Sequence, residues 1–405
     1  MNRMTSILLV GNYRPSIAVV RSLGRAGYRV IVGLFRDASF AERSRYCAEI
    51  WHHPPLGESE AFLGALTEFL RSRPDISLLM PVHQASVALL ARELRRLPDS
   101  VTPVIVPPTI VETCLDKTRM FALSASTGVP LEPYAGVTSL PELQAAVDEI
   151  GLPSIIRPIG SGPERLPGGK KAVICTDRAE LNRAFPVWPE GHRELLVQRF
   201  APGPRHNVYF AASEGRILGR VEVLIIRTDR MDDTGFAVEG MSVVPDPTLD
   251  RYSAALVRAL DYTGVGCLQF LRRDAGQFHF LELNPRLGAN FLIADRCGLD
   301  LARMACEIAT GRIGRNSTAV MDYPTGVRYA WTFGDIHGMR QARARGEISF
   351  HEAVRWGARA VRSGLTADAH LTWDVRDPMP TLYQYSYWAP FGIGRSLGAG
   401  DPGGA

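Results

Sequence analysis

Short apolar runs alternate with longer amphipathic segments in the first hundred residues, a pattern typical of mixed α/β structure. Apolar runs at 7–10, 28–32, 77–80 and 103–106 predict strands, and helical patterns stand between them at 16–26, 58–72 and 84–97. Strands that alternate with helices favour a small doubly wound sheet. We therefore expect residues 1–108 to form a Rossmann-like α/β domain that ends in the proline-rich segment 103–108.

The pattern changes to a mixed α+β arrangement after residue 108. Strands are expected near 134 and at 154–157, 172–175 and 194–200, with helices at 140–150 and 178–185. Antiparallel strands at 206–212, 216–223 and 241–244 follow, then a helix at 249–262, an apolar hairpin, and a helix at 299–310 that Gly311 caps. Residues 320–390 hold a strand and an arginine-rich helical stretch at 336–362. The glycine-rich tail at 391–405 is expected to be disordered.

The hairpin ends in the most unusual stretch of the chain, Phe278-His-Phe-Leu-Glu-Leu-Asn-Pro-Arg286, an apolar strand that carries polar groups. Glu282 and Asn284 share one face of it because side chains alternate. A hairpin symmetric about 275–276 places Gln269 opposite Glu282. Three oxygen ligands on one face suit Mg²⁺, and Arg286 adds a positive fork beside them. The alternative is a surface hairpin whose polar residues face water.

Two other segments are weaker candidates for a site. His83 follows the strand at 77–80, where ligands of open α/β sheets gather, although a helix-start histidine without a role is an equal alternative. The run 159–171, rich in Gly and Pro, is of a kind that closes over phosphates through backbone N–H groups, although most such runs are only turns. The first strand–helix turn lacks Gly-x-Gly-x-x-Gly, so the dinucleotide fingerprint is absent.

Composition argues against several classes of protein. A net charge of +4 without a basic block does not suggest nucleic-acid binding, and no apolar run approaches the roughly 20 residues of a membrane span. The N-terminus shows no signal-peptide pattern. Six scattered cysteines without Cys-x-x-Cys argue against zinc or a disulfide framework and fit a reducing cytoplasm. Only Lys117, Lys170 and Lys171 are lysines among 46 basic residues, which suggests positions where a compact ammonium is needed.

With these segments in this order, residues 1–315 resemble the ATP-grasp superfamily, most closely its carboxylate–amine (or thiol) ligase branch. The resemblance is carried by the Glu-x-Asn-Pro-Arg strand end at 282–286, Asp116-Lys117, the strand–loop–strand at 154–175 and the Gln-x-Phe-x-Pro-Gly hinge at 198–203. It implies a Rossmann-like pre-ATP-grasp domain at 1–108 and a two-lobed ATP-grasp domain at 109–315, with a small lobe at about 116–200 and a large lobe at about 201–315. A small C-terminal extension would occupy 316–390.

The resemblance also implies roles for particular residues. Lys117 and Arg157 would contact the phosphates of ATP, with Arg157 standing where the family usually has a second lysine. Arg286 would stabilise charge on the transferring phosphoryl group. Gln198 would read the adenine amino group. The other implied ATP contacts are Ser161 and Gly162 in the phosphate-covering loop and the backbone of Arg199, Phe200 and Ala201, with Phe200 as an apolar wall.

For the metal, the resemblance matches Glu282 and Asn284 to two ligands, and Gln269 stands where the first acidic ligand usually lies. A neutral amide removes one charge, so Mg²⁺ should bind more weakly, or one of two ions should be lost. Mn²⁺ is expected to substitute. An acid usually contacts the ribose hydroxyls where this chain has Arg205-His206. Asn290 and His83 are weaker candidates for contacting the substrate.

The implied function is that of a cytoplasmic, ADP-forming carboxylate–amine ligase. A carboxylate would be activated as an acyl phosphate and joined to an amine as an amide, with release of ADP and phosphate. The partners would be those two small molecules, without nucleic acid or membrane, and a homodimer is the assembly that relatives suggest. The alternatives are an ATP-grasp kinase or ligase with a thiol or hydroxyl acceptor, and a degenerate nucleotide-binding regulatory protein. The departures at 157, 205–206 and 269 motivate the last of these.

Overall fold

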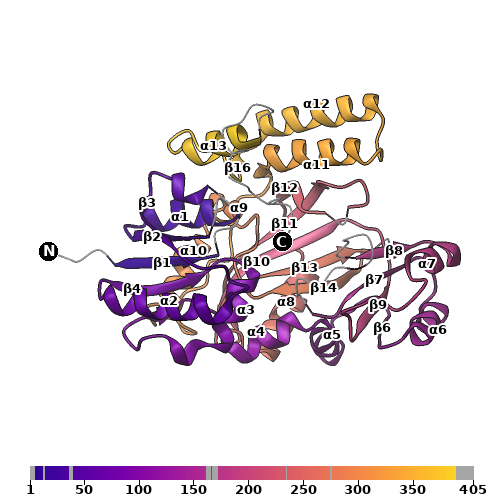
Figure 1. Cartoon of the computed structure of the whole chain (residues 1–405), viewed down its shortest axis with the longest axis horizontal. Coiled ribbons are helices and arrows are strands. Elements are labelled where there is room, and N and C mark those ends of the chain that lie inside the picture. Colours follow the sequence, from indigo (N-terminus) through magenta and orange to yellow (C-terminus); the bar gives the residue numbers. More distant parts are fainter. Residues whose placement is uncertain are drawn as a thin grey trace.

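The computed structural model describes residues 5–11, 14–35, 40–160, 166, 172–233, 235–273 and 276–388. Three sheets organise this part of the chain (Figure 1). The tail predicted at 391–405 and the loop residues Ser161 and Gly162 lie outside the described residues. None of the described helices is long and apolar enough to cross a membrane.

The N-terminal sheet has five parallel strands in the order β3-β2-β1-β4-β5. Its strands are β1 (Ser6–Val10), β2 (Arg29–Leu34), β3 (Cys47–His52), β4 (Ile76–Pro81) and β5 (Thr102–Pro103). Its helices are α1 (Ser16–Arg25), α2 (Ser59–Ser72), α3 (Gln84–Arg92) and α4 (Pro108–Leu115). The expected mixed α/β class is confirmed. The sequence pattern missed β3, an edge strand on which only Trp51 is buried.

The second sheet has four antiparallel strands in the order β6-β9-β7-β8. They are β6 (Tyr134–Val137), β7 (Ser154–Pro158), β8 (Val173–Cys175) and β9 (Leu195–Arg199), as the apolar runs predicted. Helices α6 (Leu140–Ile150) and α7 (Arg178–Ala184) bury Leu143, Val147 and Leu181 in a core of this sheet's own. Helix α5 (Lys117–Ser126) leads into the sheet, and Asp116 caps it by accepting from the Arg119 amide.

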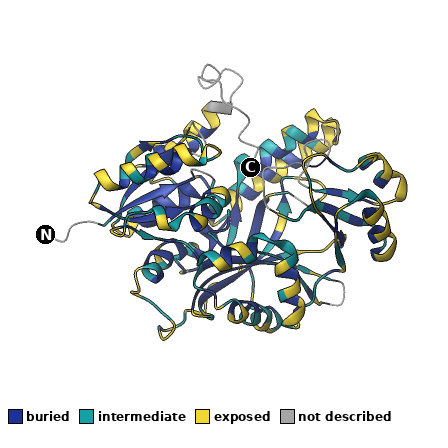
Figure 2. Cartoon of the chain, turned by 60° about the horizontal axis from the view of Figure 1, so that its bottom comes forward, coloured by how far each residue is buried: buried dark blue, intermediate teal, exposed yellow. Residues whose placement is uncertain are grey.

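The third sheet has seven strands in the order β14-β13-β10-β11-β12-β15-β16. They are β10 (Arg205–Ser213), β11 (Arg216–Thr228), β12 (Ala237–Ser242), β13 (Gly264–Arg272), β14 (Phe278–Asn284), β15 (Arg328–Ala330) and β16 (Ala369–His370). Helices α8 (Pro247–Ala259), α9 (Leu292–Arg296) and α10 (Leu301–Ala309) accompany it. Buried residues follow the strands and exposed ones follow the outer helix faces (Figure 2).

The C-terminal segment both extends this sheet and covers it. Strands β15 and β16 lengthen the β12 edge, and α11 (Thr332–Ala344), α12 (Phe350–Thr366) and α13 (Met379–Trp388) lie along one side of the molecule (Figure 1). The helical stretch predicted at 336–362 is two helices, because the chain turns at Gly346 with φ +71°. Ser349 and Glu352 then form a capping box that starts α12.

A buried ion pair joins this segment to the N-terminal domain. Asp377, 1% exposed, accepts hydrogen bonds from Arg21 Nε at 2.9 Å, Ser44 Oγ at 2.6 Å and the Arg45 amide at 2.8 Å. Burial alone would raise the pKa of Asp377, but these hydrogen bonds hold it below its ordinary value. Arg21 also donates to the Thr372 carbonyl at 2.8 Å, so the guanidinium is anchored at both ends.

Asp377→Ala should lower the free energy of unfolding by about 3–5 kcal/mol, because it leaves the buried Arg21 guanidinium without its counter-ion. Urea denaturation measures the difference. Asp322→Ala, at an exposed aspartate of the same segment, is the matched control and should change the value by less than about 0.5 kcal/mol. Equal effects of the two substitutions would contradict the role assigned to the ion pair.

Candidate functional site

A β-bulge in the β13–β14 hairpin turns two polar side chains out of the core. Gln269 pairs with Glu282, as the symmetric hairpin predicts, but Phe270 pairs with Phe280, so Leu281 is left without a partner. Strict alternation would place residues 278, 280, 282 and 284 on one face. With the bulge, Phe280 and Leu283 pack into the same core cluster, and Glu282 and Asn284 point to the opposite face.

Glu282 belongs to a row of polar side chains that crosses three adjacent strands. Gln269 lies beside it on β13, and Asn207 pairs with Gln269 on β10. Neighbouring strands lie about 4.8 Å apart, so the row spans roughly 10 Å of one sheet face. Asn207 is 4% exposed and donates to Tyr209 Oη at 3.1 Å, while its Oδ1 has no partner among the described residues.

Sequence reasoning missed Asn207. Asparagine is depleted in strands, so an asparagine inside the apolar run His206–Ala212 is a weak signal that was available. Its relation to Gln269 depends on a pairing between strands about sixty residues apart, which no local pattern predicts.

The segment after β14 lies over the next row of the same face. Arg286 donates to Asn284 Oδ1 and to Gln84 Oε1, each at 3.4 Å, and its Nε is buried without a partner among the described residues. Asn284 Nδ2 donates to Glu282 Oε1 at 2.8 Å. The chain can approach the sheet because residue 288 is glycine: a Cβ there would stand 2.7 Å from Tyr209 Cε1.

Lys117 on α5 and Arg157 on β7 both interact electrostatically with the carboxylate of Glu282. Burial lowers the pKa of Lys117 to about 8, with Arg157 in the same direction and Glu282 in the opposite direction. Burial likewise lowers the pKa of Arg157, and Glu282 raises it. Lys117 Nζ donates to the carbonyl oxygens of Pro158 and Ile159 at 3.3 and 3.0 Å. The structure thus brings both predicted phosphate-binding cations within electrostatic range of Glu282.

Arg157 is oriented by Gln198, the residue predicted to read adenine. Arg157 Nη2 donates to Gln198 Oε1 at 2.7 Å, and Gln198 is 3% exposed. One lone pair of this amide oxygen therefore serves the guanidinium, and the other is left for a donor such as an adenine amino group. Arg157 Nε is also buried without a partner within the described ranges.

The backbone after Gln198 is only partly available to a ligand. The Arg199 amide donates to the Pro133 carbonyl and the Phe200 amide to the Pro153 carbonyl, both at 2.9 Å. Among the described residues, the Ala201 amide has no backbone partner. Of the three amides in the predicted adenine-binding segment, the structure therefore leaves that of Ala201 to contact a base edge.

The structure places the remaining predicted residues in different surroundings. His206 points away from the polar face of the large sheet, and its Nδ1 lies 2.8 Å from Glu222 Oε1. Arg205 lies on the polar face, in the row next to Asn207. His83 caps α3 by accepting from the Ala85 amide at 3.3 Å, and its neighbour Gln84 accepts a hydrogen bond from Arg286. Asn290, 3% exposed, lies under β12 and β15, where it donates to the Ala237 carbonyl and Tyr329 Oη.

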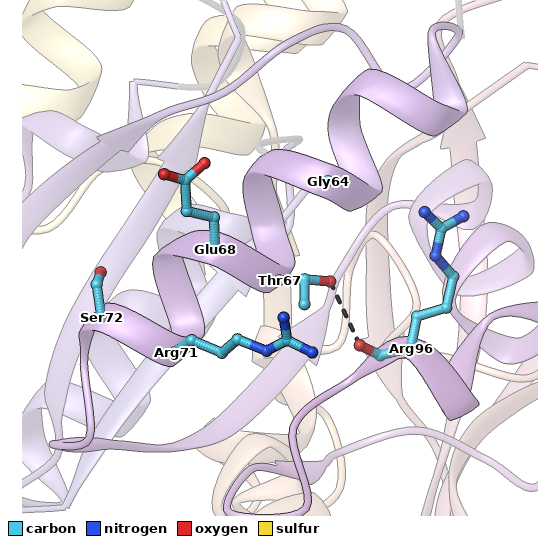
Figure 3. A pocket seen from close by; sticks show the side chains of 6 residues that line it. All are labelled: Gly64, Thr67, Glu68, Arg71, Ser72 and Arg96. Carbon is cyan, nitrogen blue, oxygen red and sulfur yellow. Dashed lines mark hydrogen bonds between the residues drawn. The ribbon is translucent and has the colours of Figure 1, made fainter.

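A hollow of about 630 Å³ lies elsewhere, on the N-terminal domain between α2 and the turn at residues 94–96 (Figure 3). Its lining residues are Gly64, Thr67, Glu68, Arg71, Ser72 and Arg96. Arg96 is already paired with Glu60 at 2.9 Å, and no buried polar atom of this lining lacks a partner. The polar face of the large sheet, where buried cations and unpartnered atoms gather, is the better candidate site.

The polar face fits a nucleotide phosphate chain better than a metal ion alone. Lys117, Arg157 and Arg286 gather near Glu282, and Asp116 also acts on Lys117, so three positive side chains face two carboxylates. Within the described ranges, no three His, Cys, Asp or Glu side chains gather as a metal site. The donor set of Glu282 and the Asn284 and Gln269 amides therefore suits Mg²⁺ that shares phosphate oxygens, because Mg²⁺ is usually held by one or two carboxylates plus substrate phosphates.

Comparison with known proteins agrees with this geometry. The family model "Carbamoyl-phosphate synthase L chain, ATP binding domain" matches residues 246–317, the segment that contains the hairpin. The chain is 28% identical over 238 residues to the N-terminal section of the carbamoyl phosphate synthase large chain of Methanopyrus kandleri, covering 55% of this chain and 40% of that protein. It is 25% identical over 219 residues to pyruvate carboxylase of Aspergillus niger, covering 50% of this chain and 18% of the relative. The chain thus spans less than half the length of these relatives.

Solved structures share the arrangement of about three quarters of the chain. Biotin carboxylase of Campylobacter jejuni superposes with a TM-score of 0.59 at 18% identity, covering 78% of this chain and 72% of that one. L-amino acid ligase of Bacillus licheniformis superposes with a TM-score of 0.60 at 13% identity, covering 76% and 75%. The predicted resemblance to the ATP-grasp superfamily is confirmed: residues 246–317 match the ATP-binding domain model, and the chain shares the fold of these solved structures.

If Lys117 contacts phosphate, nucleotide binding should be coupled to proton uptake in alkaline solution. With a pKa of about 8, Lys117 is about nine-tenths neutral at pH 9, and a nearby phosphate favours its charged form. Calorimetric titration with Mg·ADP in buffers of different ionisation enthalpy should show uptake approaching one proton at pH 9 and little uptake at pH 7. Lys117→Arg, which stays charged at both pH values, should abolish the difference. Equal uptake by wild type and variant would place Lys117 outside the phosphate site.

Proposed function

We propose that the protein is an ATP-dependent ligase that activates a carboxylate as an acyl phosphate and joins it to an amine, releasing ADP and phosphate. The main support is the row of Glu282, Gln269 and Asn207, which shares one sheet face and lies in the electrostatic range of Lys117 and Arg157. The relatives named above include ligases and carboxylases on the same fold, which agrees with this chemistry.

In the first step, an oxygen of the substrate carboxylate attacks the γ-phosphorus of ATP, and the bond to the β,γ-bridging oxygen breaks to give ADP. Little covalent work falls to the protein, so catalysis consists of positioning and charge stabilisation. Lys117 and Arg157 hold the phosphates from one lobe, and Gln198 fixes the Arg157 guanidinium against them. Arg286, held by Asn284 and Gln84, stabilises charge on the transferring group from the other lobe.

In the second step, the amine nitrogen attacks the acyl carbon, phosphate leaves, and the nitrogen loses a proton to give the amide. Arg286 remains next to the departing phosphate, where its positive charge favours the leaving group. No nucleophilic side chain is needed. The buried cysteines agree with this, because burial raises the pKa of Cys267, the cysteine on the polar face.

Magnesium would be held by Glu282 and Asn284 together with phosphate oxygens, and it would neutralise phosphate charge. Gln269 supplies no negative charge, so we propose a single ion rather than two. Mn²⁺ takes the same oxygen ligands and is expected to substitute.

The activity test is an incubation with Mg·ATP and pooled carboxylates and amines, followed by measurement of ADP, phosphate and amide. Wild-type protein should form the three products in equal amounts. Glu282→Gln should lower turnover on the order of 10²–10³-fold without unfolding the protein, because the anionic side chain that would hold Mg²⁺ against the phosphates becomes neutral. Glu68→Gln, in the hollow of Figure 3, is the matched control and should leave turnover unchanged.

Three results would go against the proposal. ADP formed with a phosphorylated product and no amide would identify a kinase. Nucleotide binding without ADP from any pool would identify a binding protein. Full activity of Glu282→Gln would show that the site lies elsewhere.

A further inference from the structure

A second pocket, of about 400 Å³, lies between helix α12 and the large sheet. Three of the residues that line it come from the sheet: Arg227 on β11, Glu239 on β12 and Arg328 on β15. Helix α12 contributes Arg359, Arg362 and the hydroxyl-bearing Ser363. Four arginines from two elements therefore surround one hollow, and neither the ATP site nor the proposed mechanism uses them.

Strand pairing places this pocket on the face of the large sheet opposite to the candidate ATP site. Arg205 lies on the polar face, and its cross-strand row continues through β11 to Gly240 and Tyr329. Glu239 and Arg328 directly precede Gly240 and Tyr329 in the chain. Successive side chains of a strand point to opposite faces, so Glu239 and Arg328 face away from the nucleotide. A ligand in this pocket would not be one of the molecules that meet at Glu282.

Buried carboxylates hold the two arginines of the sheet in place. Glu239 accepts from Arg227 Nε at 2.8 Å and from Arg328 Nη2 at 2.6 Å. Asp335, 1% exposed, accepts from Arg227 Nη1 at 3.0 Å and Nη2 at 2.5 Å, and Trp356 Nε1 donates to it at 2.6 Å. Burial alone would raise the pKa of Glu239, but its hydrogen bonds with Arg227 and Arg328 hold it below its ordinary value. A guanidinium has five N–H donors, so both arginines keep donors for a ligand.

The arginines of α12 add positive charge that no described carboxylate offsets. Arg359 and Arg362 stand three residues apart, so their side chains are neighbours on the helix surface and repel each other. Both are exposed, and neither forms an ion pair within the described ranges. Asp368 accepts from the Arg328 amide at 2.8 Å, outside the lining of the pocket. Even with Asp368, Glu239 and Asp335 counted together, four guanidinium groups face three carboxylates.

We propose that this pocket binds a small molecule that carries two linked phosphate groups. Arginine forks pair with phosphate oxygens through two parallel hydrogen bonds, and here one pair of arginines lies on the sheet and a second pair on α12. Each pair can hold one phosphate group. The volume lies within the range of about 300–1,000 Å³ that small-molecule sites occupy. The buried Ser363 makes no hydrogen bond to a described side chain or backbone group, so its hydroxyl is a further donor. The inference does not rest on the proposed ligase function.

The probe is inorganic pyrophosphate, titrated by calorimetry into the full chain. The magnesium complex of β,γ-imido-ATP, whose terminal bond resists hydrolysis, is kept saturating so that the nucleotide site is filled. We expect one pyrophosphate to bind per chain, at least tenfold more tightly than inorganic phosphate or citrate. Arg359→Met/Arg362→Met should weaken this binding at least tenfold. The control Arg92→Met/Arg95→Met removes two exposed arginines with the same spacing from the N-terminal domain and should change the affinity less than twofold.

Circular dichroism checks that the variants fold, and Arg359→Gln/Arg362→Gln replaces the methionine variant if it does not. No binding of pyrophosphate at millimolar concentration would overturn the inference. Equal losses in the two double variants would also overturn it, because they would show attraction to net positive charge rather than a site. Citrate bound as tightly as pyrophosphate would overturn the assignment of the ligand class.

Discussion

The chemistry of this protein depends on one unpaired residue in a strand. Leu281 has no partner on β13, and this bulge reverses which side chains of β14 face the core. Phe278 and Phe280 enter the core before it and Leu283 after it, so Glu282 and Asn284 face the ligand side together. Without the bulge, a carboxylate would lie in an apolar cluster, or two phenylalanines would lie in the site. The apolar core and the polar face are therefore set by the same local irregularity.

The excess positive charge on this face favours the binding of an anion such as a nucleotide phosphate. Lys117, Arg157 and Arg286 stand around Glu282, and Gln269 adds no negative charge. The depressed pKa values of Lys117 and Arg157 show that burial disfavours their charged forms in the free protein. A phosphate chain removes that excess, so nucleotide binding and ordering of the cations are expected to be coupled.

Local pattern predicted most of the strands, and the Gln269–Glu282 pairing followed from the position of the turn. The resemblance, not local pattern, selected Lys117 and Arg157 as phosphate contacts, and the structure places both within electrostatic range of Glu282. Two kinds of feature were beyond local pattern. The bulge is visible only as the adjacent apolar pair Phe280-Leu281, which also fits an ordinary buried strand.

The second kind depends on pairings between distant segments. Asn207 joins the row of Gln269 and Glu282 through strand pairing, and β15 and β16, of three and two residues, join the sheet about ninety residues or more after β12.

Hydrogen–deuterium exchange with and without saturating Mg·ATP tests the location of the site directly. Protection at 116–122, 154–160, 196–201 and 278–288 is the predicted result. Protection confined to 59–72 and 94–97, around the hollow of the N-terminal domain, would contradict it.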